Sequence, residues 1–311
     1  MEKQSLRMAY GESLVEMGLS DANIVVLEAD LGKSTMSCLF KDVYPERYFE
    51  MGIAEQSMAS TAAGLALAGK IPFYSTFAVF AFGRAYDQIR CGIAIPSANV
   101  KICGSSCGFS DFGDGKTHQS IEDANVMRMI PNMTVLNPCD AVETRKMMRA
   151  MVAHRGPVYI RINRNDLPVY TPEAGDYEIG KMSRIVAGDD VVIFATGSMV
   201  WKSVEAADLL KAEGISAEVV NVGTLKPLLK SEILKYVEGK KAIVTAEEAT
   251  KLGGLGSAIA EQIIGEVDLP FQRIGIDDEF GTSAHSYPEL LEKFGLTERH
   301  IAAAAKTALN R

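Results

Sequence analysis

The sequence predicts an α/β fold of two doubly wound domains, each with a mainly parallel sheet flanked by helices. Strand-length apolar runs alternate with amphipathic stretches long enough for crossover helices, which is the pattern of a parallel sheet covered on both faces. A chain of 311 residues is long for one domain and short for three. The alternation lapses over the polar residues 173–180. We therefore expect a first domain over residues 1–172, a linker over 173–188 and a second domain over 189–311.

In the first domain, each strand candidate is a short apolar run and each helix candidate is a longer stretch with apolar residues at helical spacing. The expected strands are Ile24–Leu27, Pro72–Phe77, Val100–Cys103, Thr134–Leu136 and Val158–Ile162. The expected helices are Leu6–Met17, Gln56–Ala68, Phe82–Ile95, Ile121–Met129 and Ala141–His154.

The second domain repeats the same alternation after the polar stretch. Its expected strands are Val191–Ala195, Ser216–Val222, Ala242–Thr245 and Phe271–Ile276. Its expected helices are Val200–Glu213, Lys230–Tyr236, Gly256–Ile264 and His300–Asn310.

Composition favours a cytoplasmic globular protein. Hydrophobic residues make up 47% of the chain and charged residues 23%, which are ordinary globular values. The longest apolar runs are of strand length, and residues 1–5 resemble neither a signal peptide nor a transit peptide. A net charge of −8 without a basic cluster argues against nucleic acid. The five cysteines form no Cys-x-x-Cys pair and the four histidines are scattered, so we expect reduced thiols and no metal site in this chain.

Three short segments carry candidate chemistry: Gly52-Ile-Ala-Glu-Gln56, Tyr74-Ser-Thr-Phe-Ala-Val-Phe80 and Asp114-Gly-Lys-Thr-His-Gln119. Glu55 precedes a strongly helix-forming run, where unpaired backbone amides stabilise a carboxylate. Each candidate also has a purely structural interpretation. Glu55 could be an acid at a helix terminus, Phe77 and Phe80 could be core residues, and His118 could be a histidine with ordinary hydrogen-bond partners. For Phe82 and Tyr86, core packing is the interpretation we keep.

Taken in order, these segments resemble the pyrimidine-binding half of transketolase, a thiamine diphosphate enzyme. The resemblance runs over nearly the whole chain and is specific in Gly52–Gln56, Ser75–Phe80, Arg84–Arg90, Gly113–Gln119 and Asn163–Pro168. It implies a glycolaldehyde-transferring enzyme that moves a two-carbon ketol unit from a ketose to an aldose.

The resemblance assigns the cofactor residues. Glu55 would hydrogen-bond the aminopyrimidine ring nitrogen and favour the imino tautomer that removes the proton from the thiazolium carbon. Such a carboxylate must be protonated or share a proton, which burial among Met51, Ile53 and Met58 would favour. Phe77 and Phe80 correspond to the family's aromatic residues against the aminopyrimidine.

The resemblance also assigns substrate residues. Asp114 would bind a hydroxyl near the reacting carbon, and His118 would lie beside the donor carbonyl and assist proton transfer. The far-end anion would be held by Arg7, Ser34 and Arg164. Ser106 stands where the family has a phosphate-binding histidine, so the pocket is expected to take an anionic end that is smaller or less charged than a phosphate dianion. A sulfonate-ended ketose, such as 6-deoxy-6-sulfofructose, or a branched sugar phosphate would suit it.

The diphosphate-binding half of the family does not match any part of this chain. Gly113-Asp-Gly115 lacks the later asparagine pair of the family's magnesium motif, and Gly253-Gly-Leu-Gly256 lacks the third glycine of a dinucleotide fingerprint. We therefore expect the C-terminal subunit of a split transketolase. A separate N-terminal subunit would hold Mg²⁺ and the diphosphate, in an α2β2 assembly that is active only when both subunits are present.

Other thiamine diphosphate enzymes share this two-domain arrangement. Deoxyxylulose phosphate synthase and the β subunits of oxoacid dehydrogenases are the alternatives, and the latter have no use for an arginine at Arg164 because their substrates carry no sugar phosphate. A non-catalytic regulatory subunit is a further alternative, which the joint presence of Glu55, Asp114 and His118 disfavours.

Overall fold

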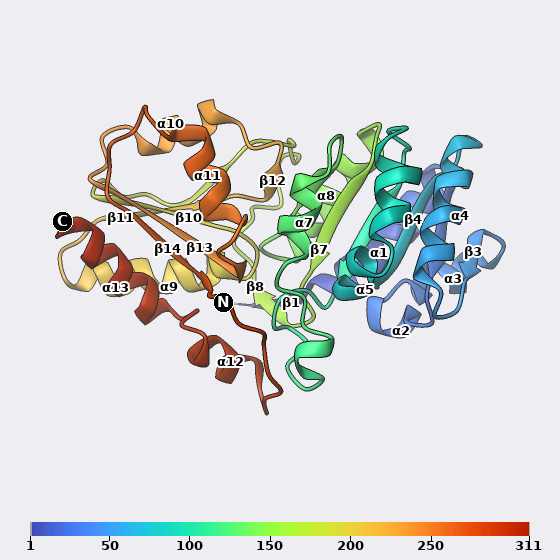
Figure 1. Cartoon of the computed structure of the whole chain (residues 1–311), viewed down its shortest axis with the longest axis horizontal. Coiled ribbons are helices and arrows are strands. Elements are labelled where there is room, and N and C mark those ends of the chain that lie inside the picture. Colours follow the sequence, from blue (N-terminus) through green and yellow to red (C-terminus); the bar gives the residue numbers. More distant parts are fainter. Residues whose placement is uncertain (1, 311) are drawn as a thin grey trace.

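The computed structural model describes residues 2–310 and contains two main sheets with helices packed on both faces of each (Figure 1). This confirms the predicted fold class. A short antiparallel pair, β1 (Lys3–Ser5) with β8 (Asp166–Pro168), ties the start of the chain to the end of the first domain. No helix within residues 2–310 combines the length and apolar character needed to span a bilayer.

The first sheet has the strand order β12-β6-β7-β5-β4-β2-β3. Adjacent strands are parallel except β12, which runs antiparallel to β6. Five strands, β2, β4, β5, β6 and β7, are almost wholly buried, as expected when helices cover both faces. The strands are β2 (Ile24–Glu28), β3 (Tyr48–Glu50), β4 (Ile71–Phe77), β5 (Lys101–Ser105), β6 (Thr134–Leu136), β7 (Val158–Ile162) and β12 (Thr224–Lys226).

Two apolar layers hold the helices on this sheet. On one face α1 (Leu6–Ser20) and α8 (Ala141–Ala153) pack together over a core that includes Tyr10 and Met147. On the other face α4 (Glu55–Leu67) and α7 (Asp123–Met129) cover a core that continues into the second domain. Shorter segments complete this half: α2 (Gly32–Thr35), α3 (Cys38–Val43), η1 (Pro45–Arg47) and η3 (Gly115–Thr117).

The expected helix Phe82–Ile95 is wrong as a single element. The chain instead forms α5 (Ala78–Gly83), α6 (Tyr86–Gln88) and the π-helical segment η2 (Ile89–Ala94). Glycines at the end of α5 and inside η2 lower the local helix propensity, so packing decides the conformation. Phe82 is buried as expected, but Tyr86 is 39% exposed and is not a core residue.

The second sheet has the order β14-β13-β10-β11-β9, with all pairs parallel except β9 with β11. In Figure 1, α10 and α11 lie above this sheet, whereas α9 and α13 lie below it. Residues 183–186, inside the expected linker, form the edge strand β9. The elements are β9 (Ser183–Val186), β10 (Val191–Ala195), α9 (Met199–Ala212), β11 (Ala217–Asn221), α10 (Lys230–Val237), β13 (Ala242–Thr250), α11 (Leu255–Ile263), β14 (Phe271–Ile276), α12 (Tyr287–Lys293) and α13 (Glu298–Leu309).

Candidate active site

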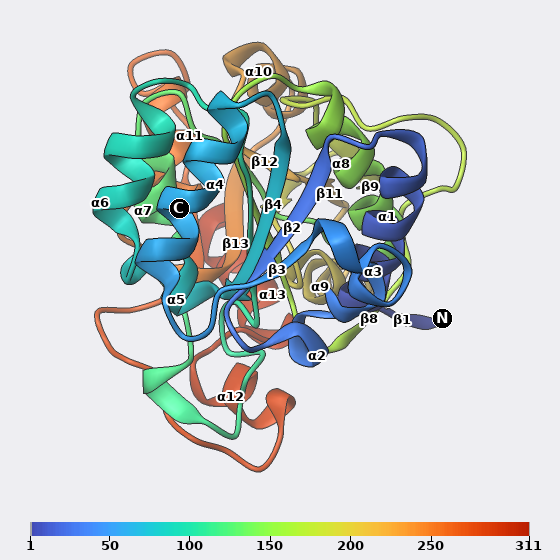
Figure 2. The same ribbon diagram turned by 90° about the vertical axis from the view of Figure 1, so that its right-hand side faces the viewer.

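The carboxyl ends of the central parallel strands carry most of the predicted site residues. Phe77 at the end of β4 is in register with Ser105 at the end of β5, and Ser105 is in register with Ile162 at the end of β7. The same edge receives α2 and α5, at the lower end of the sheet in Figures 1 and 2. Open α/β sheets bind ligands beyond the carboxyl ends of their strands, so this edge is the candidate site.

An aromatic cluster forms at this edge. The ring of His118 lies edge-on to Phe77 with 6.2 Å between ring centroids, and edge-on to Phe80 with 5.4 Å. The hydroxyl of Thr117 lies 2.9 Å from His118 Nδ1. His118 is half-buried and Asp114 in the same loop is exposed, so a ligand can reach both. The structure therefore brings His118 against Phe77 and Phe80, which lie far from it in the sequence.

Glu55 is the first residue of α4, and its side chain is buried. No hydrogen bond of its carboxylate is found within residues 2–310, and its oxygens are not among the fully buried unpaired atoms, so they remain open to a ligand. Met58 lies in the core nearby, as expected, and Met51 is half-buried. Ile53 was expected to bury Glu55, and this was wrong: it is 81% exposed, because the chain turns at Gly52 (φ +69°) before the helix begins.

Two arginines and one carboxylate form a charged group near the strand ends. Arg7 Nη1 donates to the backbone oxygen of Ser34 at 2.8 Å, and Arg7 Nε is buried without a partner in the described chain. Burial and the nearby Arg164 lower the pKa of Arg7. Arg164 Nη1 donates to Asp111 Oδ2 at 2.7 Å, and Asp111 is only 4% exposed.

Asp111 was missed by the sequence analysis. Burial raises the pKa of its carboxyl group, and Arg164 opposes that rise. It lies three residues before Asp114, just outside the Gly113–Gln119 segment that the resemblance marked, and no spacing singles it out. Only the fold brings Asp111 to the side chain of Arg164.

Ser106 follows β5 directly and occupies a confined position. Its backbone is left-handed (φ +54°), its side chain is wholly buried, and its hydroxyl has no partner among residues 2–310. The next residue, Cys107, donates its backbone N–H to the oxygen of Ile162 at 3.4 Å. The hydroxyl is therefore an unpaired donor beside the end of β7, buried rather than open to solvent.

The second domain holds the loop that carries Asp111, Asp114 and His118. Glu248 on β13 accepts the backbone N–H of Phe109 at 2.6 Å and the hydroxyl of Tyr287 at 2.6 Å. It also accepts bonds from the hydroxyl of Ser198 and from Asn163 Nδ2. A side chain at Gly108 would meet the Glu248 carboxylate at 2.5 Å, so only glycine fits that close approach.

The far end of this loop is held by the segment before α12. Ala284 N donates to the oxygen of Phe112 at 2.9 Å, and Gln119 Nε2 donates to the oxygen of Thr282 at 2.9 Å. These contacts, like Glu248, were not expected from the sequence, which assigned no site residue to the second domain.

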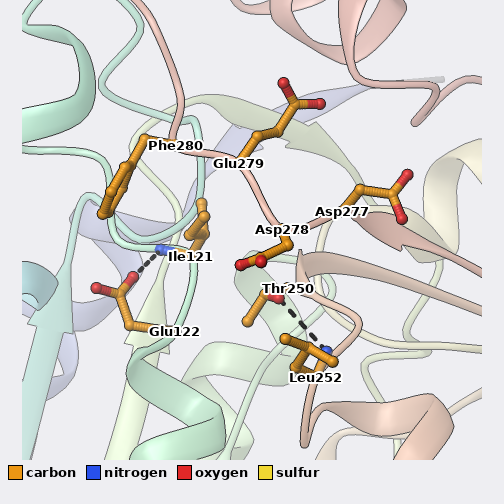
Figure 3. A pocket seen from close by; sticks show the side chains of 8 residues that line it. All are labelled: Ile121, Glu122, Thr250, Leu252, Asp277, Asp278, Glu279 and Phe280. Carbon is orange, nitrogen blue, oxygen red and sulfur yellow. Dashed lines mark hydrogen bonds between the residues drawn. The ribbon is translucent and has the colours of Figure 1, made fainter.

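A separate pocket of about 310 Å³ lies between the domains (Figure 3). It contains none of the predicted site residues. Four carboxylates line it, and burial raises the pKa of one of them, Glu122. An acidic pocket disfavours a substrate that ends in an anion. Its lining residues are Ile121, Glu122, Thr250, Leu252, Asp277, Asp278, Glu279 and Phe280.

Comparison with known proteins gives consistent matches along the chain. The model of the transketolase pyrimidine-binding domain matches residues 2–169, and that of the transketolase C-terminal domain matches residues 180–301. A putative transketolase C-terminal section from Methanocaldococcus jannaschii is 43% identical over 302 residues, covering 96% of this chain and 94% of that protein. A 6-deoxy-6-sulfo-D-fructose transketolase subunit from Clostridium sp. is 40% identical over 311 residues, covering 100% of this chain and 96% of that protein.

A solved structure has the same arrangement. A split-gene transketolase, described as an inactive beta4 tetramer, superposes with a TM-score of 0.91 at 44% identity and covers 99% of both chains. With the two matched domains, these similarities confirm the resemblance expected from the sequence. The chain belongs to the transketolase family, with its first domain corresponding to the pyrimidine-binding domain and its second to the C-terminal domain.

Proposed function

We propose that this chain is the C-terminal subunit of a two-subunit, thiamine diphosphate-dependent transketolase of the cytoplasm. It would transfer a two-carbon ketol unit from a ketose with a terminal anion to an aldose. The observation that carries the proposal is the grouping of Phe77, Phe80 and His118 at the strand ends of a transketolase pyrimidine-binding domain. The charged side chains of Arg7, Asp111 and Arg164 accompany that grouping and would face the far end of the sugar.

The residues of this chain fit the aminopyrimidine side of the cofactor. Glu55 is a largely buried residue whose carboxylate has no partner in residues 2–310 and would bond to a ring nitrogen. Phe77 and Phe80 offer aromatic surface for the ring. When bound, thiamine diphosphate supplies the carbon nucleophile that allows a carbon–carbon bond of the ketose to break.

The remaining residues would act on the sugar. His118 would move a proton at the donor carbonyl oxygen, and its half-buried ring leaves it accessible to the substrate. Asp114 would accept a hydrogen bond from a neighbouring hydroxyl. Arg7, Ser34, Ser106 and Arg164 would bind the terminal anion. Arg7 Nε and Ser106 Oγ are buried donors without partners in the described chain, which the oxygens of the anion would satisfy.

A partner subunit would complete the site. Within residues 2–310 no group of three or more His, Cys, Asp or Glu side chains is arranged to hold a metal ion. We propose that Mg²⁺ and the diphosphate bind mainly to an N-terminal subunit and that the two kinds of subunit form an α2β2 complex. The relative described as a split-gene beta4 tetramer supports self-association of this chain.

The donor is proposed to be a sulfosugar or a sugar phosphate. The Clostridium relative named for 6-deoxy-6-sulfo-D-fructose, together with the serine at position 106, favours the sulfosugar. An oxoacid dehydrogenase β-like role and a deoxyxylulose phosphate synthase-like role are less favoured, because the first needs no arginine at Arg164 and the motifs match transketolase better than the second.

Reconstitution tests the proposal. This chain is combined with the N-terminal subunit from the same organism, thiamine diphosphate and Mg²⁺, and ketol transfer from fructose 6-phosphate and 6-deoxy-6-sulfofructose to an aldose phosphate is followed. We expect transfer from at least one donor and none by either subunit alone. A non-catalytic subunit would give no transfer with any ketose although the complex forms.

A further inference from the structure

We propose that Asp111 determines end-group specificity by making the far-end pocket select a singly charged terminal group, such as a sulfonate, over a phosphate dianion. The inference rests on the proposed function, because it concerns the far end of the same ketose. It goes beyond that proposal because it assigns the selection to a carboxylate rather than to a missing histidine.

The charges of Arg7, Arg164 and Asp111 cancel only in part. Arg7 and Arg164 contribute two positive charges, and Asp111 contributes a negative charge within 2.7 Å of Arg164. Asp111 is 4% exposed, so water screens its charge weakly. Asp166 also acts on Arg7, but it is exposed and its charge is screened by solvent. Among the less exposed groups, Arg7, Arg164 and Asp111, a single net positive charge is left for the ligand.

Several hydrogen-bond donors of this charged group have no partner in the described chain and could bind an anion. Arg7 Nε and Ser106 Oγ are buried and without partners in the described chain, and Arg164 uses only Nη1 on Asp111. A sulfonate matches this combination because it has three acceptor oxygens and one charge. A phosphate ester also has three acceptor oxygens, but above its second pKa of about 6 it carries a second negative charge. That second charge would face Asp111.

Asp111 has fewer hydrogen-bond partners than Glu248, a carboxylate with a structural role. Glu248 accepts four hydrogen bonds, which occupy both of its oxygens. The carboxylate of Asp111 has one partner within residues 2–310, Arg164, which is itself half-buried and accessible. Its charge thus remains available to repel a second anionic charge, as a specificity element that acts against the wrong ligand.

The test compares three ketoses with the same carbon skeleton in the reconstituted pair: fructose 6-phosphate, 6-deoxy-6-sulfofructose and fructose, with one common aldose acceptor. Specificity constants are measured at pH 8, where the phosphate is a dianion. The variant is Asp111→Asn, which keeps the side-chain shape and an acceptor for Arg164. The matched control is Asp166→Asn, which removes an exposed carboxylate that also acts on Arg7.

We expect the wild type to prefer the sulfonate. Asp111→Asn should lower the sulfonate-to-phosphate ratio of kcat/KM by about tenfold or more, mainly through the KM for the phosphate, because one repulsive charge pair is removed from a poorly screened site. Asp166→Asn should change the ratio by less than about threefold, because surface charges are screened. If Asp111→Asn does not assemble with its partner, Asp111→Ser is measured in the same way.

An active pair whose ratio does not move in the Asp111 variant, or whose wild type prefers the phosphate, overturns the inference and leaves the proposed function intact. A pair that transfers no ketol unit from any of the three ketoses overturns the proposed function and the inference with it.

Discussion

The carboxylate of Glu55 is the clearest single-residue test of the proposed function. We expect Glu55→Gln to leave folding and subunit assembly intact and to abolish proton exchange at the cofactor carbon, because the amide cannot share a proton with the ring nitrogen. Exchange is measured by NMR on the reconstituted pair in deuterated water. Glu12→Gln, an exposed carboxylate on α1, is the control. Near-normal exchange in the Glu55→Gln variant would remove Glu55 from the cofactor site.

His118 is expected to matter for turnover rather than for cofactor affinity. His118→Ala should lower kcat by about a hundredfold or more, the usual size of a lost general acid–base contribution, with little change in the cofactor Kd. Steady-state kinetics and a cofactor titration separate the two effects. The control His300→Ala removes an exposed histidine at the start of α13. A normal kcat with weakened cofactor binding would mean that His118 only supports the aromatic cluster.

Ser106 provides an independent test of the anion pocket. Ser106→His adds a donor that can carry positive charge near neutral pH, so preference should move toward the phosphate ketose. The left-handed backbone at this position is one that histidine adopts more readily than most side chains. The ratio of kcat/KM for the two donors is the measurement, with Ser106→Asn as a neutral control. A ratio equal in both variants would show that residue 106 carries no end-group information.

For single residues, the sequence predicts those that belong to recognisable motifs and misses those whose role depends on packing. The grouping of Phe77, Phe80 and His118 followed from the resemblance, whereas their edge-on ring geometry required the fold. Asp111 was not predictable because its partner Arg164 is brought to it by two separate strand ends. Ile53 was misjudged because an apolar residue before a helix can point outward when the chain turns at a glycine.

Between elements, Glu248 joins β13 of the second domain to the active-site loop and to Asn163 after β7. Glu248→Ala removes the acceptor of the Phe109 amide and of the Ser198 and Tyr287 hydroxyls, whereas Asn163 Nδ2 keeps the Tyr287 hydroxyl oxygen at 3.4 Å. The change should lower the free energy of unfolding by about 3 to 5 kcal/mol. Ser198→Ala, which removes only one of the four donors, should cost about 1 kcal/mol. Urea denaturation of both variants checks the difference. Equal stabilities would show that Glu248 does not brace the loop.

Glu143 joins α8 to the second sheet and predicts a pH dependence. It accepts from Cys139 N and from Asn221 Nδ2, both at 2.7 Å, and burial raises its pKa from 4.5 to about 7. Because the folded pKa is above the unfolded pKa, this group favours folding fully below pH 4.5, and that contribution is lost as the pH rises through 7. The loss is about 3 kcal/mol at most.

Glu143→Gln should therefore flatten the pH dependence of stability between pH 4.5 and 7. Asn221 Oδ1 is buried without a partner within residues 2–310, so the Asn221 amide can turn to accept from the new amide. Urea midpoints across this range are the measurement, and the exposed Glu173→Gln is the control. An unchanged slope in the Glu143→Gln variant would assign the pH dependence to other buried acids.

The strong apolar runs predicted their strands well, because a buried strand leaves a continuous signal. β3, β9 and β12 were not predicted, because their pairing is set by neighbouring strands rather than by local sequence. The π-helical segment η2 likewise follows from packing against α4.

For the whole molecule, the proposal predicts that activity depends on assembly. The purified chain alone should bind thiamine diphosphate weakly even with Mg²⁺ and should not turn over ketoses, because the diphosphate side of the site is proposed to lie on the partner. Calorimetry and a coupled assay check this, and addition of the N-terminal subunit should restore both properties. Tight cofactor binding with turnover by the lone chain would contradict the two-subunit proposal.

The late synthesis of strand β12 has a consequence for folding of the first domain. Its residues, Thr224–Lys226, pair with β6, at Thr134–Leu136, as the outermost strand of a sheet otherwise encoded before residue 163. A growing chain leaves the ribosome from its N-terminus, so β10 and β11 are synthesised before β12. During that time the edge of β6 that later pairs with β12 has no partner strand. An open edge is a template for pairing with other chains. The nascent first domain is thus most prone to aggregation during that interval, and a chimaera that exchanges the second half must bring a compatible β12 to close the edge.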